Sequence, residues 1–475
     1  MSLSSLVNHL SAKFFLIILL VTALVNLLGA LGPELAFDAL WYHLTIPKIY
    51  LSLGQIQHLP GGLLYYSEMP RLAETLYLFV LPSLDEIGPH LVSWGAGIGT
   101  SLVIYKLGKK LSLPSPLALL PSVIFYVTPL VGWQSGSAYV DLLRTFFEIL
   151  ALYFLVTKKP TMSGLAIGLA ISTKTLALGS LGILAVISHF LYHDWKKTGK
   201  LILLAALVCL PWFLSAFLTT GNPLYPIGSS LLDSRHKLNL DLWNLPKLFG
   251  DFFRLWFAPE DPITPVYLLI LPFFLLNIKK LWPKNQPLIL YSLFSILVWY
   301  ITPRTGGGRF IMAYLPAWAI LIGSTVAVIS DRFVKSTIIA AILFISLLNL
   351  LYRGAATTRL SPYLLGRETK THYLCRHLDF ATSVFVDCGG FLTKTIKKTD
   401  LVYVAGVHNL YYIDFPFVHE SWYRAEEVNY ILTQSQDINA ILDRPSILNP
   451  STPGSWQLIH ENTLTKLKLY QWTSS

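Results

Sequence analysis

The stretch "SGLAIGLAISTKTLALGSLG", from Ser163 to Gly182, decides the fold class of this chain. It contains one charged side chain, Lys174, and the residues on both sides of it are small or apolar. An α-helix needs about 20 predominantly apolar residues to cross the hydrocarbon core of a bilayer. The stretch therefore predicts membrane helices, with Lys174 at the junction between segments 161–173 and 175–193.

The rest of the 475-residue sequence has the same character, since 53% of it is hydrophobic and 13% is charged. Soluble domains carry roughly 25% charged residues. Apolar runs between charged or Pro/Gly breaks predict eleven spans, at 13–31, 87–107, 114–132, 138–157, 161–173, 175–193, 200–219, 263–279, 286–302, 309–329 and 335–352. We expect a polytopic α-helical membrane protein with about 11 transmembrane helices. The net charge of +10 does not indicate a nucleic-acid partner, because the cations do not cluster on a soluble face.

Basic residues collect in one alternating set of short loops: Lys106, Lys109, Lys110, Lys158, Lys159, Lys196, Lys197, Lys200, Lys279, Lys280, Lys284, Arg332 and Lys335. Cytoplasmic loops of membrane proteins carry such an excess of Lys and Arg. We therefore expect a multi-pass protein of the cell membrane (plasma or inner) with a cytoplasmic N-terminus. The first outer loop, 32–86, and the tail after residue 352 are then extracytoplasmic.

The tail, 353–475, differs in composition, with twelve Lys or Arg and eleven Asp or Glu. Runs such as "SVFVDCG" and "DLVYVAG" predict strands, and "WYRAEEVNYILTQ", 422–434, has helical spacing. We predict two domains: a transmembrane catalytic domain over 1–352 and a small soluble, extracytoplasmic α/β domain over 353–475. Cys375 and Cys388 could pair in an oxidising compartment, and an unpaired state stays open.

The first outer loop begins with "ELAFDALWYHLTIPK", 34–48, which places charged residues just after an apolar helix. Asp38 is either a helix N-cap, which satisfies free backbone amides, or a general base that takes a proton from an acceptor hydroxyl or amine. Glu34, His43, Glu68 and Glu74 lie in the same loop. Acids with a His can bind a divalent cation, but the spacing here is loose. A divalent metal is therefore left open and no metal ligand is assigned.

Two basic positions are candidates for binding an anion. A charge at membrane depth is costly and marks an ion, substrate or pairing site, so Lys174 is a functional candidate; the alternative is a lysine that extends to the interface. Arg309 follows three glycines at a predicted helix start, where backbone amides and a guanidinium suit phosphate oxygens. Arg304 lies in the same turn.

Asp141, Arg144 and Glu148 share one face of a predicted helix, at i, i+3 and i+7. This spacing favours mutual pairing, so structural and functional roles both stay open. A carboxylate in the first outer loop, cations at the outer ends of two helices and an apolar bundle together suit a lipid phosphate at the membrane surface. We expect transfer of a group from a polyprenyl phosphate to an acceptor outside the membrane.

Several motifs also occur in a familiar order: "FDALWYHLTIPKIY" (37–50), "EMPRLAETLYLF" (68–79), "YVDLLRTFF" (139–147), "GLAIGLAISTK" (164–174), "GNPLYP" (221–226) and "GGGRFIMAYLP" (306–316). With them the chain resembles the GT-C superfamily of polyprenyl-phosphate-sugar-dependent glycosyltransferases, near the protein O-mannosyltransferases and the aminoarabinose lipid A transferase. The resemblance covers residues 1–352. It implies an inverting transfer of a sugar, of the hexosyltransferase type, from a polyprenyl-phosphate donor in the bilayer to a lipid, glycan or protein acceptor.

By motif match, the resemblance assigns the base to Asp38 and the donor phosphate to Lys174 and Arg309, with Arg304 beside them. Members of the family often show two adjacent acids in the first loop, whereas this chain has Phe37-Asp38-Ala39. A second acid must then come from Glu34 or Glu68. The predicted substrate pocket consists of Glu34, Tyr42, His43, Glu68, Glu74, Asp141 and Arg144.

The main alternative is a transporter or flippase of a lipid-linked saccharide. Such a protein needs ionisable groups near the bilayer midplane, and Arg144 and Glu148 are the candidates for that role.

Overall fold

The structure is a computed structural model that describes residues 3–227, 244–257, 261–302, 307–422, 427–443 and 453–474. Its contacts divide the chain into two compact units. We call the first the helical unit; it consists of Met1–Gly32, Met69–Ala73 and Ile87–Ser361. The second, the loop–tail unit, consists of Pro33–Glu68, Glu74–Glu86 and Pro362–Ser475. Most of the first outer loop thus groups with the tail, whereas the predicted division at 352/353 placed that loop with the transmembrane domain.

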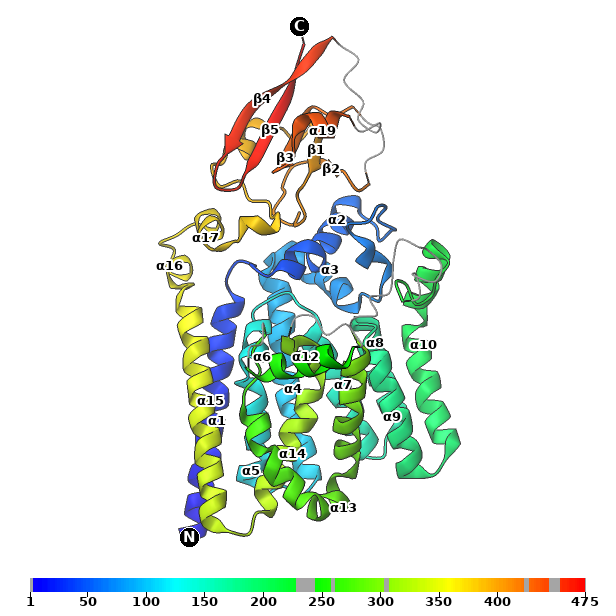
Figure 1. The fold of residues 1–475 in the computed structure, drawn as a ribbon, viewed down its shortest axis with the longest axis vertical. Coiled ribbons are helices and arrows are strands. Elements are labelled where there is room, and N and C mark those ends of the chain that lie inside the picture. The colour runs from blue at the N-terminus through cyan, green and yellow to red at the C-terminus, as the bar shows by residue number, and fades with distance from the viewer. Residues whose placement is uncertain are drawn as a thin grey trace. The chain divides into compact units, whose positions relative to one another are not determined.

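The helical unit is built from the following elements, labelled as in Figure 1: α1 (Leu3–Ala30), α4 (Ile87–Lys110), α5 (Ser115–Tyr126), α6 (Pro129–Gln134), α7 (Asp141–Val156), α8 (Pro160–Thr173), α9 (Ala177–Tyr192), α10 (Trp195–Thr220), α12 (Leu245–Phe257), α13 (Val266–Ile301), the 3₁₀ helix η4 (Gly307–Tyr314), α14 (Leu315–Val328) and α15 (Arg332–Thr358). Within the described residues, six helical segments are long and apolar enough to cross a membrane: α1 from Ala12, α4, α10, α13, η4 with α14, and α15. Shorter apolar helices include α5 and α9.

Two predicted spans, 263–279 and 286–302, differ from the structure, because residues 266–301 form the single helix α13. The lysines that were expected to lie in a loop, Lys279, Lys280 and Lys284, belong to this helix. Lysine has a high helix propensity. The polar segment around these lysines therefore interrupts the apolar run without interrupting the helix.

The predicted span 114–132 is divided instead, into α5 and α6. Thr128, directly before Pro129, has φ −57° and ψ 127°, outside the helical region. A proline disfavours helical geometry at the preceding residue, and this places the break.

Close packing of α8 on α10 depends on two glycines of the motif "GLAIGLAISTK". A Cβ atom at Gly164 would lie 2.5 Å from the carbonyl oxygen of Leu201, and one at Gly168 would lie 2.7 Å from Cβ of Val208. Small residues four apart let membrane helices approach closely. The lipid-facing side of α10 is apolar and exposed, with Leu218 74% accessible, as expected for a helix whose solvent is hydrocarbon.

The loop–tail unit contains a five-stranded sheet of order β2-β1-β3-β5-β4. Strand β1 (Val402–Ala405) pairs in parallel with β2 (Phe417–His419) and with β3 (Tyr430–Gln434). Strand β5 (Leu467–Ser474) runs antiparallel to β3 and to β4 (Gly454–Asn462). Apolar residues cover both faces: Val402, Val404 and Leu432 on one, and Tyr403 and Ile431 on the other.

The helical prediction for 422–434 was wrong for residues 430–434, which form β3. All five residues of β3 are buried. A short, fully buried apolar run has no periodicity that separates a helix from a strand, and pairing with β1 and β5 decided between them. Residues 423–426 of the predicted helix lie outside the described residues.

The remaining elements of the loop–tail unit are helical. The first loop contains the π-helical turn η1 (Ala39–His43), α2 (Thr45–Leu53), the 3₁₀ helix η2 (Tyr65–Glu68) and α3 (Leu72–Leu84). The tail begins at α16 (Ser361–Leu364) and adds α17 (Lys370–His377), η5 (Phe380–Thr382), α18 (Phe391–Thr395) and α19 (Ile438–Leu442). Cys375 and Cys388 form a disulfide, whereas Cys209 is a buried thiol.

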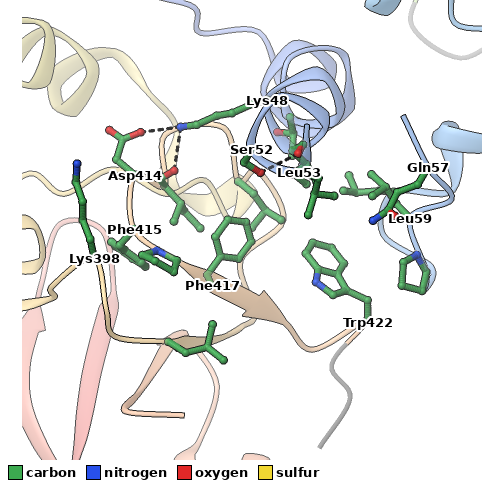
Figure 2. A pocket seen from close by; sticks show the side chains of 18 residues that line it. Lys48, Ser52, Leu53, Gln57, Leu59, Lys398, Asp414, Phe415, Phe417 and Trp422 are labelled. Atoms are coloured by element: carbon green, nitrogen blue, oxygen red, sulfur yellow. Dashed lines mark hydrogen bonds and ion pairs between the residues drawn. The ribbon is translucent and has the colours of Figure 1, made fainter. Parts of the chain in front are cut away.

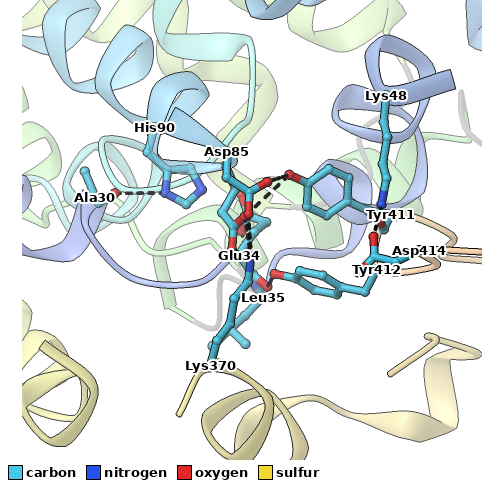
Figure 3. A network of polar contacts seen from close by, with 11 residues as sticks. Ala30, Glu34, Leu35, Lys48, Asp85, His90, Lys370, Tyr411, Tyr412 and Asp414 are labelled. Atoms are coloured by element: carbon cyan, nitrogen blue, oxygen red, sulfur yellow. Dashed lines mark hydrogen bonds and ion pairs between the residues drawn. The ribbon is translucent and has the colours of Figure 1, made fainter. Parts of the chain in front are cut away.

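Polar contacts join the first loop to the tail within this unit (Figure 3). Lys370 Nζ lies 2.7 Å from carboxylate oxygens of both Asp85 and Glu86, and the Tyr411 hydroxyl donates to Asp85. Burial raises the pKa of Glu86, and its neighbour Asp85 raises it further. Burial alone would also raise the pKa of Asp85, but hydrogen bonds with Glu86, Lys370 and Tyr411 outweigh it and hold that pKa below its usual value. Asp85 therefore carries the negative charge that pairs with Lys370.

Candidate functional site

Three predicted residues meet inside the helical unit. Lys174, which ends α8 in an extended conformation, places Nζ 2.7 Å from Oδ1 of Asp141 at the start of α7. Arg309 of η4 places Nε 4.0 Å from the other carboxylate oxygen of Asp141. Asp141 is buried, while the side chains of Lys174 and Arg309 keep about a fifth of their surface accessible, 20% and 18%. Segments far apart in sequence thus converge on one carboxylate.

Arg144 and Glu148, one and two turns further along α7, form a separate pair. Arg144 Nε lies 2.5 Å from Glu148 Oε1, and both side chains are almost fully buried. The second oxygen of Glu148 accepts hydrogen bonds from Ser180 of α9 and Tyr291 of α13. A buried carboxylate with its acceptor sites filled in this way is held in place by the surrounding bundle. The spacing favoured mutual pairing of the three charged residues of α7. The structure pairs Arg144 with Glu148, whereas Asp141 contacts Lys174 and Arg309.

Charges of both signs meet in this cluster. Lys174, Arg309 and Arg144 supply cations, and Asp141 and Glu148 supply carboxylates. Glu148 pairs with Arg144 in the buried part, whereas Lys174 and Arg309, beside Asp141, form the partly accessible part. An anion that reaches these two cations, such as a phosphate, gains charge-assisted hydrogen bonds from both.

Aromatic rings hold the two accessible cations in place. The ammonium of Lys174 lies 5.7 Å from the ring centroid of Phe310, and the guanidinium of Arg309 lies 5.4 Å from the same ring and 5.1 Å from that of Tyr139. The negative face of an aromatic ring attracts a cation without neutralising it. Sequence analysis missed both rings, although Phe310 and Tyr139 flank residues that it selected.

Asp38, the predicted base, lies in the loop–tail unit at the N-cap position of η1. Its side chain makes no capping hydrogen bond, so capping does not account for it. The Tyr42 hydroxyl donates to Asp38 Oδ2 at 3.4 Å. Burial raises the pKa of Tyr65 and the negative charge of Asp38 raises it further, which places Tyr65 close to this carboxylate as well. Asp38 is half-buried, and the phenol groups of Tyr42 and Tyr65 lie near its carboxylate.

The other polar residues predicted in the first loop form separate contacts. Glu34 Oε1 accepts from the backbone amides of Leu35 and Ala36. His43 pairs with Glu74 at 2.5 Å, and Glu68 pairs with His58 at 2.5 Å. These side chains thus take part in three different contacts. In the described part of the chain, no group of three or more His, Cys, Asp or Glu residues has the arrangement of a metal site. The remaining predicted residue, Arg304, lies outside the described residues.

Residues of the tail hold the segment around Asp38, which sequence analysis did not anticipate. The Asn409 amide donates to the carbonyl of Phe37 at 3.3 Å, and the Tyr412 hydroxyl donates to the carbonyl of Glu34 at 2.8 Å. The His408 ring stacks on Phe37, with centroids 5.1 Å apart. These contacts join residues more than 370 positions apart in sequence, and no local pattern reveals such a pairing.

By sequence, no protein-family model and no curated protein matches the chain. The fold does match solved structures. ArnT from Cupriavidus metallidurans bound to undecaprenyl phosphate is similar with a TM-score of 0.60, at 12% identity over 96% of this chain and 97% of that chain. The apo state of the same ArnT gives 0.63, at 12% identity over 97% and 98%. The oligosaccharyltransferase AglB from Archaeoglobus fulgidus, in complex with an inhibitory peptide and a dolichol-phosphate, gives 0.52, at 9% identity over 89% and 69%.

This chain has the GT-C fold. ArnT and AglB are both GT-C membrane glycosyltransferases, so the predicted resemblance is confirmed at the level of the fold. The GT-C fold together with the apolar helices also confirms a polytopic α-helical membrane protein. At 9–12% identity these structures establish architecture, and the roles of individual residues stay predictions.

Proposed function

We propose that this chain is a polyprenyl-phosphate-dependent glycosyltransferase that moves a sugar to an acceptor on the outer side of the cell membrane, with inversion at the transferred carbon. The observation that carries the proposal is the pair of partly accessible cations, Lys174 and Arg309, beside buried Asp141 within an apolar bundle of GT-C fold. Charged side chains in an apolar bundle are costly and mark ligand or ion sites, and a lipid phosphate that binds these cations leaves its polyprenyl tail in the bilayer.

In the proposed reaction, the bond between the anomeric carbon of the sugar and the phosphate oxygen breaks, and the phosphate leaves with the electron pair. Lys174 and Arg309 stabilise the negative charge that develops on this leaving group. An acceptor hydroxyl or amine forms the new bond to the anomeric carbon, and Asp38 takes its proton. The phenol groups of Tyr42 and Tyr65 orient this carboxylate.

Two further observations support the outer location of the reaction. Lys and Arg concentrate at helix ends and turns that alternate along the chain with the first loop and the tail, such as Lys109 and Lys110 at the end of α4 and Lys196 and Lys197 at the start of α10. The tail also contains the Cys375–Cys388 disulfide, and such bonds persist in oxidising compartments. The acceptor on that side is a lipid, a glycan or a protein.

The test uses the full chain in lipid nanodiscs with radiolabelled polyprenyl-phosphate sugars and a cell-envelope extract as acceptor. We expect label transfer by the wild type and its loss in Asp38→Asn and in Lys174→Ala, with Lys200→Ala, at an exposed position of α10, as the matched control. Undiminished transfer in Asp38→Asn would remove Asp38 from the mechanism while leaving the enzyme class. Movement of the lipid-linked sugar across vesicles without any transfer would replace the enzyme with a flippase.

A further inference from the structure

A pocket in the loop–tail unit lies between helix α2 of the first loop and the segment of the tail that includes β2 (Figure 2). Its volume is about 720 Å³, within the range of about 300–1,000 Å³ found for small-molecule sites. Both walls belong to the same compact unit. The residues that line this pocket have no role in the chemical step proposed above.

Aromatic rings form the centre of the pocket. The rings of Phe417 and Trp422 lie side by side there in Figure 2, with centroids 6.2 Å apart, and Phe415 lies nearby. The face of an aromatic ring carries partial negative charge. A pyranose ring presents a face of weakly positive C–H groups, which is complementary to such rings, and carries hydroxyl groups around its edge.

Polar groups surround these rings. Figure 2 shows Gln57 at one end of the pocket and Lys398 at the other, with Asp414 near Lys398. These side chains offer an amide, an ammonium and a carboxylate, which together donate to and accept from sugar hydroxyls. Asp414 keeps 80% of its side chain accessible although it pairs with Lys48.

The pocket is preformed, because Lys48 fixes one wall to the other. Its ammonium donates to the backbone carbonyls of Tyr411 and Ile413 and lies 2.6 Å from Asp414 Oδ1. Lys48 and Asp414 neutralise each other, so Lys398 is the one uncompensated charge among the lining residues. A preformed site loses little conformational entropy when it binds a ligand, and this charge balance suits a neutral or weakly acidic ligand.

Other ligand classes fit less well. An acyl or prenyl chain makes no hydrogen bonds, so it would leave Gln57, Lys398 and Asp414 without a role. A peptide bound by strand addition needs a long free edge, whereas the edge strand β2 beside the pocket has three residues. Aromatic faces bordered by an amide, an ammonium and a carboxylate favour a saccharide.

The pocket also lies close to Asp38 along the chain. Thr45, which lines it, is seven residues beyond Asp38, and its hydroxyl donates to the carbonyl of Leu40, so that η1 leads directly into α2. The seven residues from Asp38 to Thr45 run through this π-helical turn into α2, so the lining begins within roughly 10 Å of Asp38. A saccharide held in the pocket can therefore extend its terminal ring toward the proposed base.

We propose that this pocket is an acceptor subsite and that the acceptor is a neutral or weakly acidic saccharide, free or carried on another molecule, stacked on Trp422 and Phe417. The inference rests on the proposed glycosyltransferase function and selects the glycan among its possible acceptors.

The experiment uses saturation-transfer NMR on the full chain in nanodiscs, with a panel of methyl hexosides and short oligosaccharides, both neutral and uronic-acid-containing. We expect saccharide signals in the wild type, binding that is roughly tenfold or more weaker in Trp422→Ala, and retention of most of the affinity in Trp422→Phe, which keeps an aromatic face. Gln57 is exposed, so Gln57→Leu provides a variant with little risk to folding, and it should also weaken binding.

A matched glycine pair tests the shape of the pocket without removing a lining group. Gly61 has φ +85°, and a Cβ atom there would overlap the backbone of Ser421, next to Trp422, whereas Gly62 faces open space. Gly61→Ala should displace Trp422 and weaken saccharide binding, and Gly62→Ala should not. Absence of saccharide signals across the panel, or equal affinity in wild type and Trp422→Ala, would overturn the inference.

Transfer assays on the same preparations separate this inference from the proposed function. Transfer of label to a lipid or peptide, with no saccharide bound, would overturn the acceptor assignment and leave the transferase. Saccharide binding that depends on Trp422, with no transfer from any donor, would retain the pocket as a saccharide site and overturn the transferase.

Discussion

Opposite effects on lipid-phosphate binding are expected from neutralising Lys174 and from neutralising Asp141. Asp141 is a buried carboxylate that lies beside both Lys174 and Arg309. Lys174→Met removes one of the two accessible cations and should weaken binding of undecaprenyl phosphate. Asp141→Asn removes the competing anion and should strengthen it.

The magnitudes follow from burial. Truncating one partner of a buried, hydrogen-bonded charge pair costs about 2–5 kcal/mol. Lys174 keeps 20% of its side chain accessible, which favours the lower part of that range, about 2–3 kcal/mol, or roughly 30- to 150-fold in Kd. Asp141 also positions Lys174 at 2.7 Å, so Asp141→Asn loses part of its gain. We expect about 1 kcal/mol, roughly fivefold tighter binding.

The assay is native mass spectrometry or thermophoresis of the full chain in nanodiscs, titrated with undecaprenyl phosphate at two salt concentrations. Lys200→Met, at an exposed position in the second turn of α10, is the control and should leave Kd unchanged. If Asp141→Asn weakens binding as much as Lys174→Met does, Asp141 serves to position the lysine, and the argument that it competes with the lipid phosphate is wrong.

Three further predictions concern stability, each read from thermal unfolding of the full chain. Glu148→Gln should lower the free energy of unfolding by about 3–5 kcal/mol because it leaves Arg144 buried without its carboxylate. Arg144→Met combined with Glu148→Gln should recover much of this loss. A smaller effect of Glu148→Gln alone would show that water reaches the pair. Gly168→Ala should destabilise the packing of α8 on α10 by about 1–3 kcal/mol, whereas the control Gly182→Ala, whose Cβ meets open space, should be neutral or stabilising by up to about 1 kcal/mol; equal effects would contradict the close approach. Burial lowers the pKa of His419; its Nδ1 accepts from the Ser421 amide and its Nε2 lies 2.9 Å from the Val407 carbonyl, so the folded state holds the neutral ring. Because the unfolded chain is protonated first as the pH falls, the stability of the folded state should decrease below about pH 6.5. His419→Gln should make stability depend less on pH in this range.

Much of the membrane architecture was predictable because hydropathy is a local property. The apolar runs located α4 and α10 to within about five residues at each end, and the runs at 13–31 and 335–352 located the apolar parts of the longer helices α1 and α15. Lys174 lies where the sequence placed it, between α8 and α9. Hydropathy failed at α13, where a charged turn of helix resembles a loop, and at β3, where a buried run has no period.

The candidate site was predictable only in part. Spacing identified the three charged residues of α7 as one face, but it did not show that Asp141 faces Lys174 and Arg309 while Glu148 faces Arg144, Ser180 and Tyr291, because that choice depends on which helices pack on either end of α7.

The sequence by itself determined that this chain lies in a membrane and which residues are charged within its apolar part. These properties follow from the free energy of transfer of each segment, which depends on the segment alone. Only the tertiary structure decided that Asp141 is shared by two cations, that Asn409 and Tyr412 hold the segment around Asp38, and that a preformed pocket opens beside α2. Each of these contacts joins segments distant in the chain, and the geometry that selects them exists only once the helices and the sheet have packed.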